Sequence, residues 1–264
     1  MEFVRQNWVR ESEFEALEAT RVFDAIHLKI QTILATNRRA FVLLDLDSTL
    51  YEVSERSAQI FRHAARDLGE LPAPVRARLE TVSKEELGYS VRDSWVALGL
   101  CAQDPALSAA CESLERYWRH HFFSDTFLGH DELYAETREW VNRLHATGAE
   151  IVYLTGRDEP AMRQGTLANL VRDGLPVGPG THLCLKDRRD RDDVEHKVGA
   201  ARRFAETGEI AASFENEPRN FAALVAAFPD ASHVFVDTIC SEKPAPKVRG
   251  VYRLRPTLRS ELGL

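Results

Sequence analysis

The chain has 264 residues, enough for one or two domains with a sizeable core. Its composition, 44% hydrophobic and 28% charged residues, is that of an ordinary soluble globular protein. The formal net charge of -7 argues against non-specific binding of nucleic acid, which needs a basic surface. A small anionic substrate stays open, because a local site can be positive on an acidic protein.

The sequence predicts a cytoplasmic protein with no membrane partner. The N-terminus has no apolar signal core, and no run of about 18 apolar residues occurs. The four cysteines are scattered and lack metal-binding spacing, so we expect buried, reduced thiols. They are Cys101, Cys111, Cys184 and Cys240.

Residues 1–38 precede the first predicted strand and are expected to form a helical extension. Apolar residues recur there at helical spacing, at Phe23, Ile26, Ile30, Ile33 and Leu34. We expect this helix to pack on the domain or on a second subunit, and the oligomeric state is not readable from the sequence. We assign the extension no chemistry.

The apolar run Phe41–Leu44 predicts a buried strand of a parallel sheet, and it ends on two carboxylates, Asp45 and Asp47. Surface loop charge is the alternative. At the carboxyl edge of an open α/β sheet, however, both acids would face the crevice in which such sheets bind ligands. Carboxylates suit Mg²⁺, and a carboxylate can also attack phosphorus.

The segment Asp45-Leu46-Asp47-Ser48-Thr49 resembles motif I of the haloacid dehalogenase (HAD) superfamily, most of whose members are magnesium-dependent phosphatases. The resemblance implies that Asp45 is the nucleophile and Asp47 the general acid and base. Asp47 argues against the dehalogenase branch, because a halide leaving group needs no proton and dehalogenases lack that acid.

Helices are expected throughout residues 52–126, over 55–68, 73–82, 84–98 and 105–122. In the resemblance, this is the position of a cap that helps to select the substrate. Trp95, Tyr117 and Trp118 are expected in the cap core. Arg92 and Arg119 are candidates for contacting a substrate anion, because arginine suits phosphate and carboxylate groups.

A helix over 131–146 and an apolar strand over 150–154 follow, and the strand ends in Thr155, Gly156 and Arg157. This end resembles motif II, which implies that the Thr155 hydroxyl holds the transferring phosphoryl group. Gly156 would allow backbone N–H groups to approach the phosphoryl oxygens. Thr155 could instead be a turn residue, and Arg157 could bind substrate or pair locally.

A helix over 160–173 and a short strand over 181–185 come next, followed by a mixed-sign run over 186–193 that is expected to be a solvated loop. Lys197, near the start of the following helix, matches motif III by position. The resemblance implies that its ammonium group neutralises phosphoryl oxygens and pairs with the nucleophile. Lys186 is the competing candidate.

The strand 210–214 ends in Glu215 and Asn216, which resembles motif IV, the acidic end that completes the magnesium site. The common pattern has two aspartates, so the chain departs from it. Glu215 is the expected ligand, and Asn216 and Asn220 are the alternatives. A strand over 232–236 follows, and Asp237 and Thr238 at its end match no motif and are interpreted as structural. An edge strand is expected over 251–254.

Alternating strands and helices predict an α/β, Rossmann-like, doubly wound parallel sheet. We assign residues 1–51 and 127–264 to this core and residues 52–126 to an inserted helical cap.

The resemblance implies a magnesium-dependent phosphomonoester hydrolase in which Asp45, Asp47, Thr155 and Lys197 are catalytic. Thr155, Gly156, Arg157 and Lys197 would bind substrate. Mg²⁺ would be held by Asp45, the main-chain carbonyl of Asp47, and Glu215. The expected substrate is a small phosphorylated metabolite. The segment 192–197 and the Glu-Asn-Glu-Pro end are also similar to the phosphatase part of polynucleotide-kinase-type proteins, which keeps a nucleotide or nucleic-acid 3′-phosphate open. A phosphotransferase or phosphomutase, or a non-catalytic metabolite-binding module, are the alternatives.

Overall fold

The structure, a computed structural model, describes residues 5–100 and 105–257 and divides into two compact units. The α/β unit comprises 1–51, 133–159 and 170–264, and the helical unit comprises Glu52–Glu132 and Pro160–Asn169. The segment 52–126, assigned to a cap from the sequence, lies inside the helical unit. That unit extends further, to Glu132, and takes in 160–169, which the sequence had assigned to the core.

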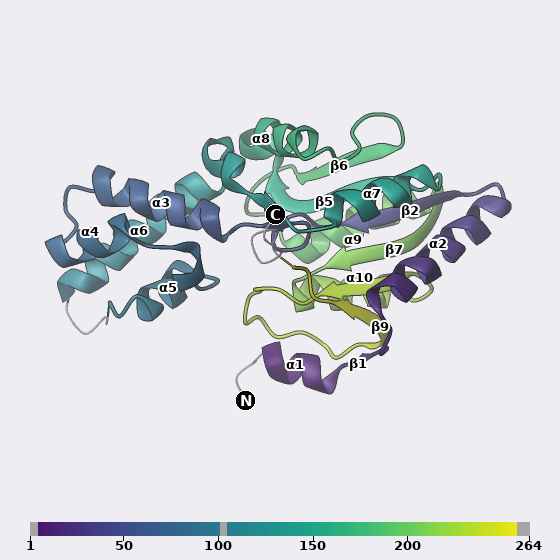
Figure 1. The fold of residues 1–264 in the computed structure, drawn as a ribbon, viewed down its shortest axis with the longest axis horizontal. Helices are drawn as coiled ribbons and strands as arrows, with labels where there is room; N and C mark the ends of the chain where they lie inside the picture. The colour runs from purple at the N-terminus through teal and green to yellow at the C-terminus, as the bar shows by residue number, and fades with distance from the viewer. Residues whose placement is uncertain (1–4, 101–104, 258–264) are drawn as a thin grey trace. The chain divides into compact units, whose positions relative to one another are not determined.

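The α/β unit is built on a seven-stranded sheet in the order β1-β9-β8-β7-β2-β5-β6. Its strands are β1 (Glu13–Phe14), β2 (Arg39–Leu44), β5 (Glu150–Asp158), β6 (Thr181–Lys186), β7 (Gly208–Glu215), β8 (Ser232–Val236) and β9 (Arg249–Leu254). Every recorded strand pair in it is parallel. The chain winds from β2 outward through β5 and β6, then returns to β7 on the other side of β2 (Figure 1). The predicted doubly wound parallel sheet is confirmed.

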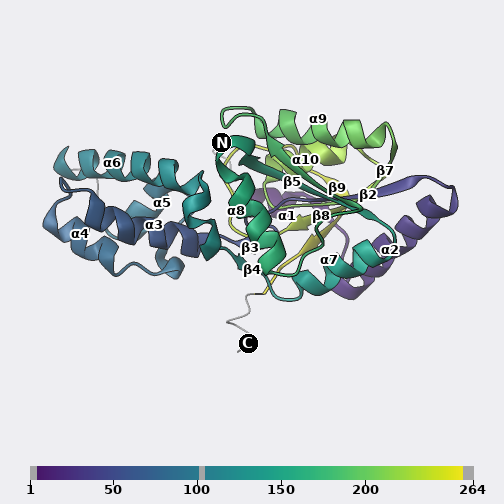
Figure 2. The same cartoon turned by 90° about the horizontal axis from the view of Figure 1, so that it is seen from above.

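Helices cover both faces of this sheet, which is why its central strand β2 is buried from Ala40 to Leu44. The helices of the unit are α1 (Arg5–Glu11), α2 (Ala19–Ala35), α7 (Thr137–Ala146), α9 (Asp193–Ala205) and α10 (Pro218–Ala227), together with the two ends of α8 (Glu159–Arg172). Figure 2 shows α9 and α10 on one face and α2 and α7 on the other.

Each face has its own core. On the α9 and α10 side, Phe41 and Leu43 of β2 pack with Ala200 and Leu224. On the opposite face, the rings of Phe23, Trp140 and Phe214 stack together, with Trp140 and Phe214 centroids 4.8 Å apart. The predicted N-terminal helix is therefore α2, and its apolar stripe packs on the sheet of its own chain.

The first residues of the chain cover what would otherwise be the edge of the sheet. Strand β1 pairs with β9, so β9 is not the edge strand that the sequence predicted. Trp8 of α1 packs edge-on against Phe235 at 5.0 Å between centroids, and its Nε1 donates to the carbonyl of Pro246 at 2.8 Å. Covering β9 leaves only a two-residue strand exposed at this side, which limits pairing with other chains.

The helical unit consists of α3 (Ser54–Asp67), α4 (Ala73–Glu80), the 3₁₀ turns η1 (Lys84–Glu86) and η2 (Asp125–His130), α5 (Val91–Ala97), α6 (Pro105–Phe122) and the middle of α8. Two short strands, β3 (Tyr51–Glu52) and β4 (Glu132–Leu133), form a separate two-stranded sheet. Trp95 lies in the core of this unit, and Tyr117 and Trp118 pack against it, as the sequence predicts.

The predicted helix over 84–98 is wrong, because it is interrupted. Turn η1 ends at Glu86, and α5 begins only at Val91. Ser90 caps α5 by accepting the Asp93 N–H at 3.1 Å, while the Ser90 N–H donates to the Asp93 carboxylate at 3.0 Å. A Cβ on Gly88 would lie 2.5 Å from the Asp93 Cβ, so the capping turn needs glycine there.

A buried ion pair ties the helical unit together. The Nε and Nη2 atoms of Arg56 lie 2.6 and 2.7 Å from the two carboxylate oxygens of Asp131, and both side chains have no solvent exposure. Asn169 donates to the Asp131 Oδ2 at 3.2 Å, and the Arg56 guanidinium lies over the Phe122 ring. This pair could not be predicted from the sequence, because its members are 75 positions apart.

Three smaller expectations have mixed outcomes. The predicted helix over 131–146 begins only at Thr137, after β4 and a left-handed Glu136 at φ 64°. Cys111, Cys184 and Cys240 are free thiols, while Cys101 lies outside the described residues. Among residues 5–100 and 105–257, none of the helices combines the length and apolar character that crossing a membrane requires.

Candidate active site

The carboxyl ends of three neighbouring strands bring the sequence-predicted acids to one edge of the sheet. Leu44, the last residue of β2, pairs with Phe214 of β7, and the Asp45 N–H donates to the Phe214 carbonyl at 3.1 Å. Asp45 and Glu215 therefore follow paired positions on adjacent strands. On the other side of β2, Leu44 pairs with Tyr153 of β5, two residues before Thr155.

Lys197 joins the two acidic strand ends. Its Nζ lies 2.6 Å from Asp45 Oδ1 and 2.5 Å from Glu215 Oε2, and all three side chains are at least nine-tenths buried. The second oxygen of Glu215 accepts the backbone N–H groups of Asn216 and Glu217 at 3.1 and 3.0 Å. Helix α9 thus places one ammonium group between two carboxylates that are far apart in the sequence.

The electrostatics of the cluster follow from burial. Removal from water raises the pKa of Asp45, and Lys197 opposes that shift. Burial and the nearby Asp45 charge raise the pKa of Glu215 to about 8. Burial alone would lower the pKa of Lys197, but the two carboxylates outweigh it and raise that pKa. The lysine therefore stays charged, and its ammonium group is shared between the two carboxylates.

Thr49 and Asn216 hold the other side of Asp45. The Thr49 hydroxyl lies 2.8 Å from Asp45 Oδ2 and 3.2 Å from the carboxamide oxygen of Asn216. A threonine hydroxyl has only one proton, and the charged, closer Asp45 oxygen is the stronger acceptor. The Asn216 oxygen is therefore a buried acceptor that Thr49 serves only in part.

The turn between Asp45 and Tyr51 has a fixed shape. The carbonyl of Leu46 accepts the N–H groups of Thr49, Leu50 and Tyr51, and the Ser48 N–H donates to the Tyr51 carbonyl at 2.7 Å. Ser48 adopts a left-handed backbone with φ 59°, which small residues tolerate best. This turn sets where the Asp47 side chain emerges beside Asp45.

Arg157 of the motif II segment contacts Asp47. The guanidinium Nη2 lies 2.6 Å from Asp47 Oδ1, and Nε lies 3.2 Å from the same oxygen. The Arg157 side chain is 1% exposed and lies 5.9 Å from the centre of the Tyr51 ring. The structure shows this ion pair with Asp47, and binding of substrate by Arg157 stays a prediction.

Thr155 and Gly156 occupy the end of the same strand. Thr155 is buried, and its hydroxyl accepts the Arg157 N–H at 3.2 Å. A Cβ added to Gly156 would lie 3.2 Å from the Asp193 carboxylate, so glycine here lets the first residue of α9 approach the strand closely.

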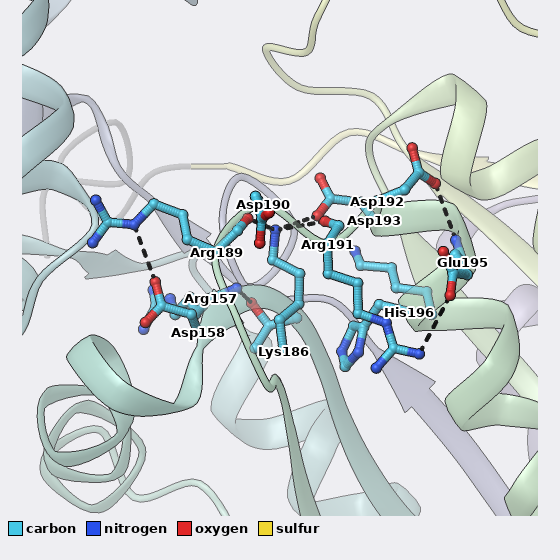
Figure 3. Close-up of polar contacts among 12 residues, drawn as sticks. Arg157, Asp158, Lys186, Arg189, Asp190, Arg191, Asp192, Asp193, Glu195 and His196 are labelled. Carbon is cyan, nitrogen blue, oxygen red and sulfur yellow. Dashed lines mark hydrogen bonds and ion pairs between the residues drawn. The ribbon is translucent and has the colours of Figure 1, made fainter.

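Lys186, the competing lysine, is engaged elsewhere (Figure 3). Its Nζ donates to the Asp193 carboxylate at 2.9 Å and to the carbonyls of Arg189 and Arg191 at 2.8 and 3.2 Å. These contacts use all three ammonium protons. The Lys186 ammonium group therefore holds the 187–192 loop by hydrogen bonds to two of its carbonyls. Lys197, in contrast, contacts Asp45.

Asp45 contacts the Lys197 ammonium group on one side and the Thr49 hydroxyl on the other, and carboxylate, hydroxyl and amide oxygens are the ligand type that Mg²⁺ prefers. Within residues 5–100 and 105–257, no group of three or more His, Cys, Asp or Glu side chains is placed to hold a metal ion. A complete site needs other oxygens as well. The partly served Asn216 carboxamide oxygen, close to Thr49 and Asp45, is such a donor. The residues present fit a hard divalent ion on that basis.

Arg92 and Arg119 belong to the helical unit, and their contact with a substrate anion stays a prediction. Arg92 and Arg119 are 74% and 69% exposed and lie 3.5 and 3.8 Å from the same acid, Glu115. Asn220 is buried on α10. The sequence analysis assigned Thr49 no role of its own, although its position four residues after Asp45 is a local signal. The partner of Arg157 carries no such signal, because it lies 110 positions away.

Comparison with protein-family models and with curated proteins gives no match. Solved structures do give similarities. A Clostridium difficile protein provisionally named a phosphatase has TM-score 0.49 and 14% identity, with 81% of this chain and 95% of that chain covered. A haloacid dehalogenase-like family hydrolase from Streptococcus pneumoniae has TM-score 0.48 and 12% identity, with 81% of this chain and 95% of that chain covered. Protein Tyrosine Kinase A from Mycobacterium tuberculosis has TM-score 0.49 and 16% identity, with 85% of this chain and 96% of that chain covered.

Proposed function

We propose that the chain is a HAD-type, magnesium-dependent phosphomonoester hydrolase that works through an aspartyl-phosphate on Asp45. The observation that carries the proposal is the Lys197 ammonium between Asp45 and Glu215, at 2.6 and 2.5 Å. It supports the proposal because a carboxylate nucleophile facing an anionic phosphoryl group needs a fixed positive charge beside it. The same three residues come from the three segments that resemble motifs I, III and IV.

In the first half of the proposed reaction, Asp45 attacks phosphorus in line with the leaving oxygen. Its two carboxylate oxygens are held by Lys197 and Thr49, which fixes the direction of attack. Asp47 gives a proton to the departing alkoxide oxygen. The leaving alcohol takes that proton, and the phosphoryl group becomes an acyl phosphate on Asp45.

In the second half, Asp47 takes a proton from a water molecule that attacks the acyl phosphate. Inorganic phosphate leaves, Asp45 returns to its carboxylate form, and Asp47 is protonated for the next cycle. Lys197 and the Thr155 hydroxyl hold phosphoryl oxygens while charge moves between the attacking and leaving atoms.

Mg²⁺ would be held by Asp45, the main-chain carbonyl of Asp47 and Glu215, with Asn216 as a further oxygen donor. When bound, the ion offsets the charge between nucleophile and phosphoryl oxygens. Glu215 already accepts three hydrogen bonds, from Lys197 and two backbone N–H groups. Within the described residues, the Asn216 oxygen accepts a hydrogen bond from the Thr49 hydroxyl alone, at 3.2 Å. This supports Asn216 as a direct ligand of the ion.

We propose a small phosphorylated metabolite, with a nucleotide among the candidates, as the substrate. The acidic net charge supports a soluble ester over a polyanionic nucleic acid. The cytoplasmic location expected from the sequence stays a prediction.

The test is hydrolysis of p-nitrophenyl phosphate with and without Mg²⁺, followed by a panel of metabolite phosphates. We expect magnesium-dependent release of free phosphate that Asp45→Asn and Lys197→Met abolish. Lys186→Met is the matched control, because it removes a buried lysine that does not contact Asp45. Turnover without Mg²⁺, or an active Asp45→Asn variant, would contradict the proposal. An isomerised ester in place of free phosphate would identify a phosphomutase.

A further inference from the structure

Residues 238–241, which begin one residue after the end of β8, contact both acidic strand ends, and we call this segment the strand-end latch. None of the motifs in the sequence includes it. Two of its residues, Cys240 and Ser241, are buried. The latch contacts the turn after β2 through Ser48 and the end of β7 through Asn216 and Glu217. It therefore joins two segments that supply the proposed nucleophile and metal ligands.

Thr238 makes the contact with the turn after β2. Its hydroxyl donates to the main-chain carbonyl of Ser48. Ser48 is buried and has the left-handed backbone described above, so its peptide planes have little freedom to reorient. The Ser48 carbonyl lies one residue beyond the proposed Asp47 ligand carbonyl. A donor to the Ser48 carbonyl therefore restrains the peptide geometry of the turn that carries Asp47.

Ile239 and Ser241 make the contacts with the end of β7. The Ile239 carbonyl accepts the Asn216 Nδ2 at 2.7 Å, which turns the Asn216 oxygen toward Thr49 and Asp45. Ser241 donates through its N–H and its hydroxyl to the Glu217 carboxylate at 2.9 and 2.6 Å. The latch thus orients the Asn216 amide so that its oxygen, and not its nitrogen, faces Asp45.

We propose that Thr238 is a positioning residue for the phosphoryl-transfer site, acting through the Ser48 carbonyl on Asp47 and its turn. The proposal rests on the proposed function for its kinetic consequence, but its structural part concerns the turn alone. Thr238 touches no reacting atom. Its effect is to hold the turn in one geometry, and small displacements of a catalytic group are costly in rate.

The first variants are Thr238→Val, which keeps the shape and removes the hydroxyl, and Thr238→Ser, which restores it. We expect Thr238→Val to lower kcat roughly tenfold with KM changed by less than about twofold, and Thr238→Ser to recover most of the loss. The matched control is Thr147→Val. Thr147 also donates to a main-chain carbonyl, that of Leu144 at 2.6 Å, but it precedes β5 at the opposite edge of the sheet.

The second measurement is amide hydrogen exchange in the absence of metal and substrate. We expect exchange of residues 46–51 to rise about fivefold in Thr238→Val and to stay unchanged in Thr147→Val, because only the first variant frees the turn. Unchanged exchange at 46–51 in Thr238→Val would overturn the inference, as would equal kcat losses in Thr238→Val and Thr147→Val. Absence of phosphatase activity in the wild-type protein would contradict the proposed function. The exchange measurement would still test whether Thr238 holds the turn.

Discussion

Arg157 and Asp47 form an ion pair at the edge of the sheet, with Nη2 2.6 Å from Oδ1. The arginine is 1% exposed and the aspartate 29% exposed, so a buried cation holds a carboxylate that faces outward. In the proposed reaction the protonated form of this side chain, regenerated in each cycle, donates the proton to the leaving group. The guanidinium therefore fixes the orientation of the general acid.

Replacing Arg157 with glutamine should affect substrates according to their leaving groups. p-Nitrophenolate departs without a proton, whereas an alkoxide needs one from Asp47. We expect Arg157→Gln to lower kcat/KM for glycerol 2-phosphate roughly tenfold more than for p-nitrophenyl phosphate. Steady-state kinetics on both esters measures this difference. Arg189→Gln, which removes a half-exposed arginine paired with Asp158, is the control. Equal losses on both esters would show that Arg157 does not act through Asp47.

Asn216 departs from the paired aspartates of the motif that it resembles, and its contacts give a physical reason. An aspartate there would place an oxygen about where Nδ2 now donates to the Ile239 carbonyl, 2.7 Å away. Two acceptors would then face each other in a buried place. We expect Asn216→Asp to lower the free energy of unfolding by about 1–3 kcal/mol and to reduce phosphatase activity.

Urea denaturation without metal measures the stability part of that prediction. Asn142→Asp is the control, because Asn142 donates to the carbonyls of Arg138 and Gly174 but is exposed. Its cost should be smaller, since water can serve the groups that lose their partner. If Asn216→Asp were more stable or more active than the wild type, the Ile239 carbonyl would not be what selects asparagine.

The buried pair of Arg56 and Asp131 predicts a large stability effect in the helical unit. Asp131→Asn leaves the fully buried arginine without its counter-charge, which typically costs 3–5 kcal/mol, so we expect a loss of about that size. Arg56→Met combined with Asp131→Leu should cost much less, because no charge is left unpaired. A double-mutant cycle by chemical denaturation measures the coupling.

The surface pair of Arg38 and Glu209 supplies the comparison for this cycle. Its side chains are 52% and 39% exposed, and breaking it with Arg38→Ala should cost no more than about 1 kcal/mol. Similar costs for Arg38→Ala and Asp131→Asn would refute the assignment of a structural role to the buried pair.

Buried His233 predicts that stability falls in mild acid. Its Nδ1 lies 2.7 Å from the Ser213 hydroxyl and its Nε2 lies 2.8 Å from the Phe228 carbonyl, and burial lowers its pKa. The unfolded chain therefore binds a proton at a pH where the folded protein does not. The stabilisation is complete above the unfolded pKa of about 6.5 and is lost as pH falls below it.

Urea denaturation at pH 7.5 and 5.5 measures this dependence. We expect the difference in unfolding free energy between the two pH values to shrink in His233→Gln, because that side chain does not titrate. His130→Gln, which removes an exposed histidine, is the control. An unchanged difference in His233→Gln would rule out His233 as a source of the acid sensitivity.

The parallel sheet and the strand ends were predictable because their signals are local. The apolar run before Asp45 and the one before Glu215 each mark a strand, and their carboxyl ends meet wherever parallel strands are neighbours. The helix predicted over 84–98 failed for a similar local reason. Ser90 and Asp93 form a capping box there, and the apolar periodicity concealed it.

The partners within the site were not predictable in the same way. The Thr238 hydroxyl and the Ser48 carbonyl are 190 positions apart, and nothing near Thr238 in the sequence marks it. Arg157 was equally able to face a ligand or an acid on sequence grounds. Which contact forms depends on where the strands end relative to each other, and that geometry exists only after the sheet assembles.

Trp8 and Pro246, joined by a hydrogen bond, are 238 positions apart, which has a consequence for biosynthesis. The α1 segment leaves the ribosome long before β8 does, so the Trp8 and Phe14 rings have no Phe235 ring to pack against until β8 has been translated. We expect ribosome-bound nascent chains to expose both rings to chaperones that bind apolar segments. Docking of α1 and β1 would then be among the last folding events of the α/β unit.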